Sequence, residues 1–294
     1  MPYATARDNT RLYYEETGDR TSRCTPLIFV HEFSGDYRSW ETQVRFFSRR
    51  YRCITFSARG YPPSDVPKAR AKYSYKIAVD DIADVLRHLK IQKAHVVGCS
   101  MGAYSSLQFG MRYPAMALSV TSVGAGAGSN PDTRAAFLRA TEANAQLFET
   151  LGMPAAVRSR GFAAGRIPQM LKDPRGFAEF RRIHESHSAV GLANVQRGVQ
   201  AKRPPIYQLE KALRNYRAPL MVIAGDEDDN SIGPALFIKQ VCRKARLWIC
   251  PSAGHTVNTE EPDMFNRNLL DFLTLVDGGC WKPRDARSVV SVKR

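Results

Sequence analysis

The chain has 294 residues, of which 44% are hydrophobic and 24% are charged. This length suits one large domain, or one domain with an inserted subdomain, and the composition is ordinary for a globular protein. No apolar run approaches the roughly 18 residues that a membrane span needs, and the N-terminus lacks the apolar stretch of a signal peptide. We therefore expect a cytoplasmic protein with no membrane partner.

The net charge of +15 is unevenly distributed along the chain. Residues 131–217 carry 15 Lys and Arg against 7 Asp and Glu, whereas residues 218–294 carry 10 of each. A basic segment above a site could attract an anionic substrate, although solvated surface charge is the simpler explanation. No dense Lys/Arg run or known nucleic-acid-binding motif accompanies the charge, so we expect no nucleic-acid partner.

Short apolar runs rich in β-branched residues alternate with helical patterns along most of the chain. Strands are expected near residues 11–16, 26–31, 51–56, 93–98, 117–123, 219–224 and 245–250. Helices are expected near residues 38–50, 76–90, 101–113, 232–242 and 261–276. Repeated βα units predict an α/β fold, with a mostly parallel central sheet and helices on both faces.

A Gly- and Ala-rich segment, residues 124–131, interrupts this alternation and begins a polar, helix-rich stretch that lasts to about Arg217. The stretch is too long for a simple connection between strands, so we expect an inserted helical cap. Its helix-like segments lie near residues 132–150, 153–163 and 174–187. His184 and His187 share one face of the last segment, where they contact substrate or, more commonly for histidines, pack inside the cap.

The expected organisation therefore has four parts. They are a first core part at 1–130, the helical cap at 131–217, a second core part at 218–277 and a basic tail at 278–294.

The pentapeptide Gly98-Cys99-Ser100-Met101-Gly102 has the pattern G-x-S-x-G and lies between a strand-like and a helix-like run. In that context the pattern is typical of a nucleophile elbow. The turn presents the serine oxygen at a helix N-terminus, where partial positive charge favours a developing oxyanion. Gly98 and Gly102 leave room for the strand and the helix to pack closely. Ser100 is therefore the candidate nucleophile.

Two later strands end in the partners that a serine nucleophile needs. The apolar run 218–224 leads into Gly225-Asp226-Glu227-Asp228-Asp229, and the run 245–250 leads into Gly254-His255. Each reactive residue lies just past the carboxyl end of a strand, the edge where open α/β sheets place their sites. The chain order of serine, acid and histidine is that of the α/β-hydrolase triad.

With these motifs the chain resembles the α/β-hydrolase fold family over most of residues 3–276. Four further segments carry the resemblance. Thr5–Glu15 is similar to the family's opening hairpin, with Asp8-Asn9 at its turn, and Leu27–Phe33 is similar to a strand that ends in His-Gly-x. Arg59–Asp65 is similar to the turn Asp-x-Arg-Gly-x-Gly-x-Ser, and Gly254–Pro262 is similar to the loop of the catalytic histidine.

The resemblance also implies roles for particular residues. His255 would be the general base, and Asp228 the acid that orients it, because the family's acid usually lies three residues past the glycine that ends the strand. The backbone amides of Phe33 and Met101 would form the oxyanion hole. This chemistry needs no metal or organic cofactor.

Two residues depart from the family pattern. Ser57 replaces the usual Asp, which affects only a structural turn. Glu32 replaces the usual Gly and places a carboxylate beside the expected oxyanion hole, where an unscreened negative charge would oppose the tetrahedral intermediate. We expect Glu32 to form an ion pair, with Arg59 or Arg38 as its partner. Direct substrate binding by Glu32 is the alternative.

The sequence thus predicts a serine hydrolase that acts on a carboxylic ester or a related acyl bond of a small molecule. A serine nucleophile argues against epoxide hydrolases and haloalkane dehalogenases, which use Asp. The sequence leaves other activities open, namely those of a C–C bond hydrolase, a lactonase, an amidase, a perhydrolase and a non-hydrolysing small-ligand receptor. It also leaves open whether the protein is a homo-oligomer. The six cysteines match no metal pattern and fit reduced packing residues.

Overall fold

The computed structural model describes residues 2–20, 24–159 and 164–288. Its strands form one sheet in the order β1-β2-β4-β3-β5-β6-β7-β8. The pairs from β4 to β8 are parallel, whereas β1 and β2 run antiparallel at one edge. The strands are β1 (Tyr3–Thr5), β2 (Arg11–Thr17), β3 (Pro26–Val30), β4 (Arg52–Phe56), β5 (Ala94–Cys99), β6 (Ala117–Val123), β7 (Leu220–Gly225) and β8 (Ala245–Cys250).

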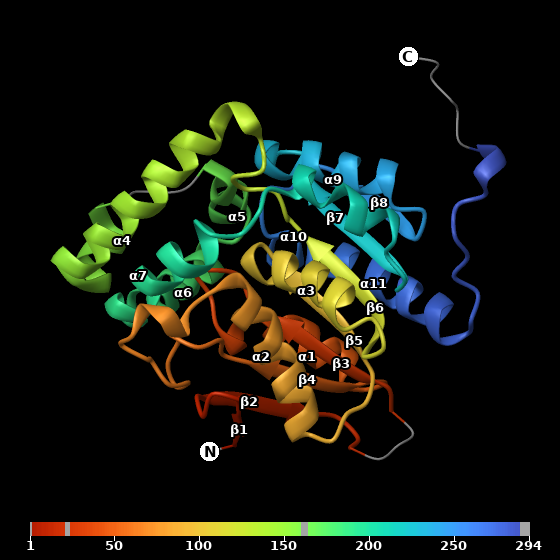
Figure 1. Cartoon of the computed structure of the whole chain (residues 1–294), viewed down its shortest axis with the longest axis horizontal. Coiled ribbons are helices and arrows are strands. Elements are labelled where there is room, and N and C mark those ends of the chain that lie inside the picture. Colours follow the sequence, from red (N-terminus) through yellow and green to blue (C-terminus); the bar gives the residue numbers. More distant parts are fainter. Residues whose placement is uncertain (1, 21–23, 160–163, 289–294) are drawn as a thin grey trace.

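Helices cover both faces of this sheet (Figure 1). One face carries α2 (Tyr75–His88), α3 (Met101–Arg112) and α9 (Asp229–Val241), and the other carries α1 (Glu41–Phe47) and α11 (Pro262–Asp277). The predicted mostly parallel sheet with helices on both faces is therefore confirmed.

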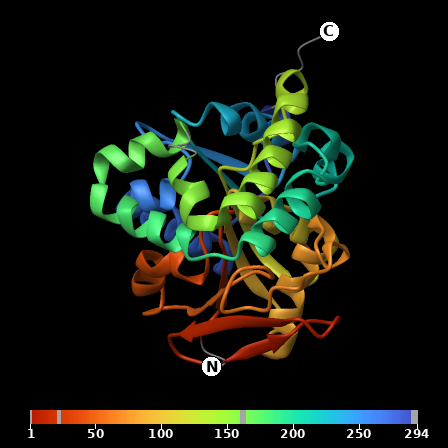
Figure 2. The ribbon, with the colours of Figure 1, turned by 90° about the vertical axis from the view of Figure 1, so that its left-hand side faces the viewer.

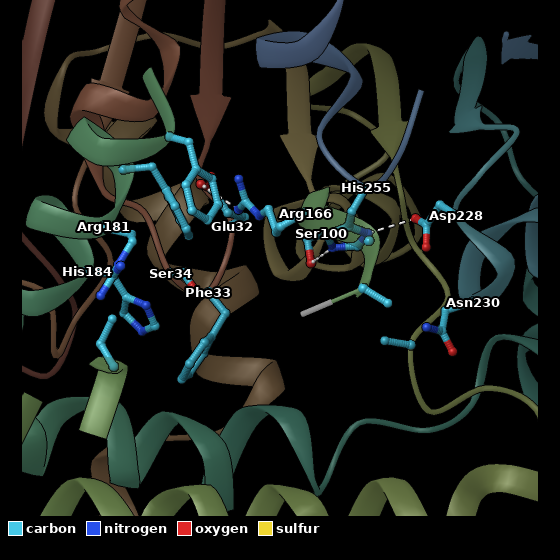
Figure 3. Close-up of a pocket in the computed structure, with 16 residues that line it drawn as sticks. Glu32, Phe33, Ser34, Ser100, Arg166, Arg181, His184, Asp228, Asn230 and His255 are labelled. Carbon is cyan, nitrogen blue, oxygen red and sulfur yellow. Dashed lines mark hydrogen bonds and ion pairs between the residues drawn. The ribbon is translucent and has the colours of Figure 1, made fainter. Parts of the chain in front are cut away.

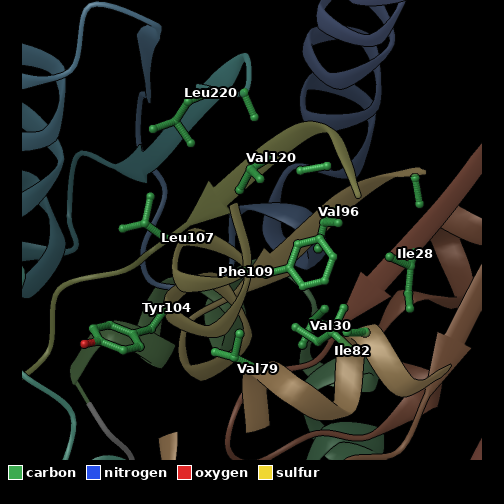
Figure 4. Packing of buried hydrophobic residues seen from close by; sticks show 14 of the residues in the cluster. Ile28, Val30, Val79, Ile82, Val96, Tyr104, Leu107, Phe109, Val120 and Leu220 are labelled. Atoms are coloured by element: carbon green, nitrogen blue, oxygen red, sulfur yellow. The ribbon is translucent and has the colours of Figure 1, made fainter. Parts of the chain in front are cut away.

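Helix α2 shows why these elements form. The Ser74 hydroxyl accepts a hydrogen bond from the Ile77 amide and caps the first turn. Val79, Ile82 and Leu86 then recur at helical spacing and are buried against the sheet. Figure 4 shows this core, in which Phe109 from α3 packs among side chains of the central strands.

The segment between β6 and β7, which we call the helical insertion, contains five α-helices within its described residues. The first four lie together beyond one end of the sheet, whereas the last packs beside α9 on one face of the sheet (Figures 1 and 2). Its helices are α4 (Pro131–Ser159), α5 (Ile167–Lys172), α6 (Pro174–Glu185), α7 (Ala189–Val195) and α8 (Glu210–Arg214). The short helices α5, α7 and α8 were not predicted.

The two helices expected near 132–150 and 153–163 are both present in α4, which is interrupted by a kink at the non-helical Gly152, whose φ is 70°. Residues 160–163 lie outside the described part. One expected boundary in the insertion needs correction. The helix expected at 174–187 ends at Glu185, so His187 follows α6 and does not share a helical face with His184.

The turn between β5 and α3 is tight, and its glycines are required because a side chain at either position would collide with the backbone. Ser100 has φ 54° and ψ −111°, a left-handed conformation that non-glycine residues rarely adopt. A Cβ on Gly98 would lie 2.2 Å from the carbonyl oxygen of Gly102, and one on Gly102 would lie 2.1 Å from that of Val30. Small residues at both positions therefore let α3 approach β5 and β3.

The tail is anchored at Trp281, whose ring lies 4.6 Å from that of Phe272 and whose indole N–H donates to the Lys244 carbonyl. Cys53, Cys99 and Cys250 are buried, as the sequence predicts, and all six cysteines are free thiols. Among the described residues, no helix is long and apolar enough to cross a bilayer.

Candidate active site

Three residues from three different strand ends form one hydrogen-bonded chain (Figure 3). Ser100 follows β5, Asp228 follows β7 and His255 follows β8. The Oγ of Ser100 lies 2.7 Å from Nε2 of His255, and the Nδ1 of that ring lies 2.7 Å from Oδ2 of Asp228. The three residues predicted from sequence therefore meet at the carboxyl edge of the sheet.

The neighbouring acids have other contacts. An oxygen of Asp226 accepts a hydrogen bond from the Ala253 amide at 3.1 Å. Asp229 is the first residue of α9, and it is Asp228, not Asp229, whose carboxylate binds His255. Burial acts to raise the pKa of Asp228, but the hydrogen bond and the charge of His255 outweigh burial and hold this pKa below its ordinary value. Asp228 is therefore an ionised partner for the imidazole at neutral pH.

The loop that carries His255 is held from two sides. The carboxylate of Glu260 accepts hydrogen bonds from the amides that flank the histidine, those of Gly254 at 2.6 Å and Thr256 at 2.9 Å. The amide of His255 itself donates to the Gly165 carbonyl of the helical insertion at 2.8 Å. The core and the insertion thus both fix the backbone of this residue.

The two amides expected in the oxyanion hole lie at the ends of two elements. Phe33 comes shortly after β3, and Met101 is the first residue of α3. Within the described part of the chain, neither amide donates a hydrogen bond to another group. The peptide that carries the Phe33 amide is held through its carbonyl, that of Glu32, which accepts a hydrogen bond from the Gly35 amide at 3.2 Å. The carbonyl of Phe33, in the next peptide, accepts from the Tyr61 hydroxyl at 2.9 Å.

Glu32 is 5% exposed and forms an ion pair, but with neither of the two expected partners. Its Oε1 accepts from Arg166 of the insertion and from the Ser39 hydroxyl, each at 3.3 Å. The expected partner Arg38 binds the nearby Asp36 at 2.6 Å instead.

The other expected partner, Arg59, is unavailable to Glu32 for a similar reason. Its guanidinium is shared between Asp81 at 2.6 Å and Asp8 at 2.9 Å. Both predicted pairings of Glu32 were therefore wrong, because carboxylates closer to each arginine already bind it.

A cavity of about 340 Å³ opens at Ser100 and is bounded by both the core and the insertion (Figure 3). The core supplies mostly polar groups, and the insertion supplies mostly aromatic and cationic ones. The core residues are Glu32, Phe33, Ser34, Ser100, Asp228, Asn230 and His255, and those of the insertion include Val157, Arg166, Phe177, Phe180, Arg181 and His184.

Of the two histidines singled out in the sequence, only His184 lines this cavity. His187 instead packs against the core, with Nε2 3.2 Å from the Ser34 carbonyl. Sequence reasoning missed Arg166, Phe180 and Asn230, which belong to no motif; the basic composition of 131–217 was the only signal near Arg166. No group of three or more His, Cys, Asp or Glu among the described residues could hold a metal ion.

Four features together define the α/β-hydrolase arrangement. They are a mostly parallel sheet, a serine in a strand–turn–helix elbow, and an acid and a histidine at the ends of later strands. Residues 25–262 match the profile of the alpha/beta hydrolase fold. The chain therefore belongs to the α/β-hydrolase fold family, and its relatives support a hydrolase activity.

Two relatives of low identity cover most of the chain. A protein of Bacillus subtilis (strain 168), provisionally named 2-succinyl-6-hydroxy-2,4-cyclohexadiene-1-carboxylate synthase, is 26% identical over 92% of this chain and 98% of its own length. The 3-oxoadipate enol-lactonase 1 of Acinetobacter baylyi is 26% identical over 81% of this chain and 85% of its own length.

Solved structures show the same fold. The enol-lactonase from Burkholderia xenovorans LB400 superposes with a TM-score of 0.80 at 23% identity, covering 93% of this chain and 100% of that one.

Proposed function

We propose that the protein is a serine hydrolase that cleaves a carboxylic ester, or a related acyl bond, of a small molecule. The observation that carries this proposal is the hydrogen-bonded chain from Ser100 through His255 to Asp228, which opens into the cavity. These are the contacts that a catalytic triad requires, with a nucleophile, a base within hydrogen-bond reach and a group that orients the base.

In the proposed mechanism, Nε2 of His255 removes the proton of Ser100 as Oγ attacks the acyl carbon. The same nitrogen then donates that proton to the leaving group, and water repeats the cycle on the acyl-enzyme. Asp228 holds the imidazole in the required tautomer and stabilises its cationic form, which fits a carboxyl whose pKa is lowered.

The amides of Phe33 and Met101 are the proposed donors to the oxyanion. Their lack of an acceptor among the described residues and the place of Met101 at the start of α3 support this role. The helix N-terminus adds positive potential where negative charge develops. Loss of one such donor typically costs about 3 kcal/mol in the transition state.

We further propose that the helical insertion is a cap, because it supplies the wall of the cavity opposite Ser100. Phe177 and Phe180 favour an apolar acyl or alcohol group there. Arg181 lines the same cavity, and its positive charge would favour an anionic group on the substrate nearby.

Labelling by a fluorophosphonate tests the proposal. Ser100 should react covalently, because it is the serine that His255 makes nucleophilic. Intact mass with peptide mapping should place the adduct at residue 100. Turnover of a short-chain p-nitrophenyl ester should disappear in Ser100→Ala. No adduct under conditions that label a control esterase would contradict the triad.

The alternatives would give different results in the same assays. An amidase, a lactonase or a C–C bond hydrolase would still react at Ser100 but would prefer anilides, lactones or vinylogous diketones over esters. A non-hydrolysing receptor would bind a small ligand tightly and turn over none of these substrates.

A further inference from the structure

Arg166 is the cavity residue with the most unusual set of contacts. It lies in the helical insertion just before α5, is only 7% exposed and places its guanidinium carbon 4.0 Å from the centre of the Phe180 ring. A buried guanidinium is costly unless its donors are satisfied. Its position is therefore set by where its acceptors lie.

One acceptor belongs to the loop after β3. The Nη2 of Arg166 donates to Oε1 of Glu32 at 3.3 Å. Glu32 directly precedes Phe33, whose amide is the proposed oxyanion donor. A carboxylate at this place would repel the oxyanion if it were uncompensated, so the Arg166 charge offsets it while the hydrogen bond fixes the loop.

The other acceptors lead to the loop after β8. The Nη1 of Arg166 donates to the Thr256 hydroxyl at 3.2 Å and to the Gln169 side chain at 2.8 Å. That hydroxyl in turn donates to Glu260 at 3.2 Å, the carboxylate that holds both amides flanking His255. One guanidinium thus connects the loops of two different strands.

We propose that Arg166 is a positioning residue, which holds the Phe33 amide and the His255 ring in register with Ser100 from the helical insertion. This inference rests on the proposed function, because it assigns Arg166 to the same reaction. Two loops fixed by one planar group keep their relative distance, and a displacement of about 1 Å in a catalytic site can lower the rate on the order of a hundredfold.

The test compares Arg166→Met, Arg166→Lys and a matched control. The control is Arg197→Met, because Arg197 is another insertion arginine with a mostly buried side chain, but it binds Glu142 and Glu149 and contacts neither loop. In Arg166→Met we expect kcat for a p-nitrophenyl ester to fall about 10- to 100-fold, with KM changed less than about threefold.

The kcat values of the other two variants should lie above that of Arg166→Met. Arg166→Lys should recover part of kcat, since an ammonium can bind one loop but lacks the planar fork that reaches both. Arg197→Met should stay within about twofold of the original kcat. A rise in KM alone for Arg166→Met would overturn the proposal, because Arg166 would then bind substrate. An unchanged kcat would also overturn it.

Hydrogen–deuterium exchange read by mass spectrometry provides a measurement that does not depend on activity. Arg166→Met should increase exchange in peptides covering residues 31–36 and 253–258 but not in α3, and the control should change neither loop. If both loops keep their protection, the proposal is wrong even if kcat falls. If the unmodified protein turns over no substrate, the proposed function fails, and the exchange result alone decides whether Arg166 holds the loops.

Discussion

The carboxylate of Glu32 is compensated by the charge of a neighbouring side chain, that of Arg166. The hydrogen bonds that this carboxylate accepts from Arg166 and Ser39 both end on the same oxygen, Oε1. The side chains of Glu32 and Arg166 are 7% and 9% exposed, so solvent screens this pair little. A buried pair of this kind depends on both members, because removal of one charge leaves the other uncompensated.

We therefore expect Glu32→Gln chiefly to lower stability. The amide oxygen can still accept from Arg166, so the loop stays in place, but the arginine charge loses its counter-ion. The free energy of unfolding should fall by about 3 kcal/mol, while kcat/KM on a simple ester changes less than about threefold. Unchanged melting together with a large rate change would show that Glu32 acts on the oxyanion or the substrate instead.

At the scale of elements, the packing of α3 against the sheet depends on the contact between Gly102 and β3. A Cβ at residue 102 would lie 2.1 Å from a backbone oxygen of Val30, which cannot rotate away as a side chain could. The helix and the strand must separate to accept it, and Ser100 at the start of the helix would move with them.

Gly102→Ala should therefore lower the free energy of unfolding by about 2 kcal/mol or more and abolish labelling of Ser100. Gly152→Ala is the control. Its φ of 70° and ψ of 164° make alanine unfavourable, at a cost of about 1–3 kcal/mol. Among the described residues, however, no atom beyond its own chain neighbours lies within 4 Å of the new Cβ, so Ser100 should still be labelled. Denaturant unfolding and labelling are measured on both variants, and loss of labelling in both would contradict this explanation.

The elements of the core could be predicted from sequence because their signals are local. The strands β3 to β8 are apolar runs, and α2, α3 and α11 have helical periodicity and sequence signals at their ends. The contact chain of Ser100, Asp228 and His255 was predictable too, since strand order in a parallel sheet brings these strand ends to one edge.

The insertion could not be predicted in the same detail. Its short helices α5, α7 and α8 contain too few residues to show a period, and they are stabilised by packing. The contact between Glu32 and Arg166 spans 134 residues and belongs to no motif. Nearer arginines suggested the wrong partner, because the sequence does not show which carboxylates they already bind.

At the scale of the whole molecule, the insertion and the core meet at His187. Its side chain lies against Ser34 and, edge-on, against Tyr61, with ring centres 5.1 Å apart. Burial lowers the pKa of His187 to about 4; the nearby Asp36 acts in the opposite direction, whereas His31 and Arg38 act with burial. The ring is therefore neutral at pH 7 and donates to the Ser34 carbonyl.

This lowered pKa predicts a loss of stability in acid. The unfolded chain takes up the His187 proton near pH 6.5, whereas the folded protein does so only near pH 4. Stability is therefore complete above pH 6.5 and declines through this window, by at most about 3 kcal/mol from this residue. The drop in melting temperature between pH 7 and pH 4.5 should be smaller in His187→Gln, and an equal drop would rule out this contribution.

The bond between the Gly165 carbonyl and the His255 amide also affects how this protein could be given a new substrate. Directed evolution would naturally target wall residues such as Arg166 and Phe180, but Arg166 adjoins the carbonyl that holds the histidine, and Phe180 packs on Arg166. Selectivity and turnover would then change together. Val157 and Ala127 line the same cavity from α4 and the loop before it, so a library at these two positions would alter shape while leaving the histidine undisturbed.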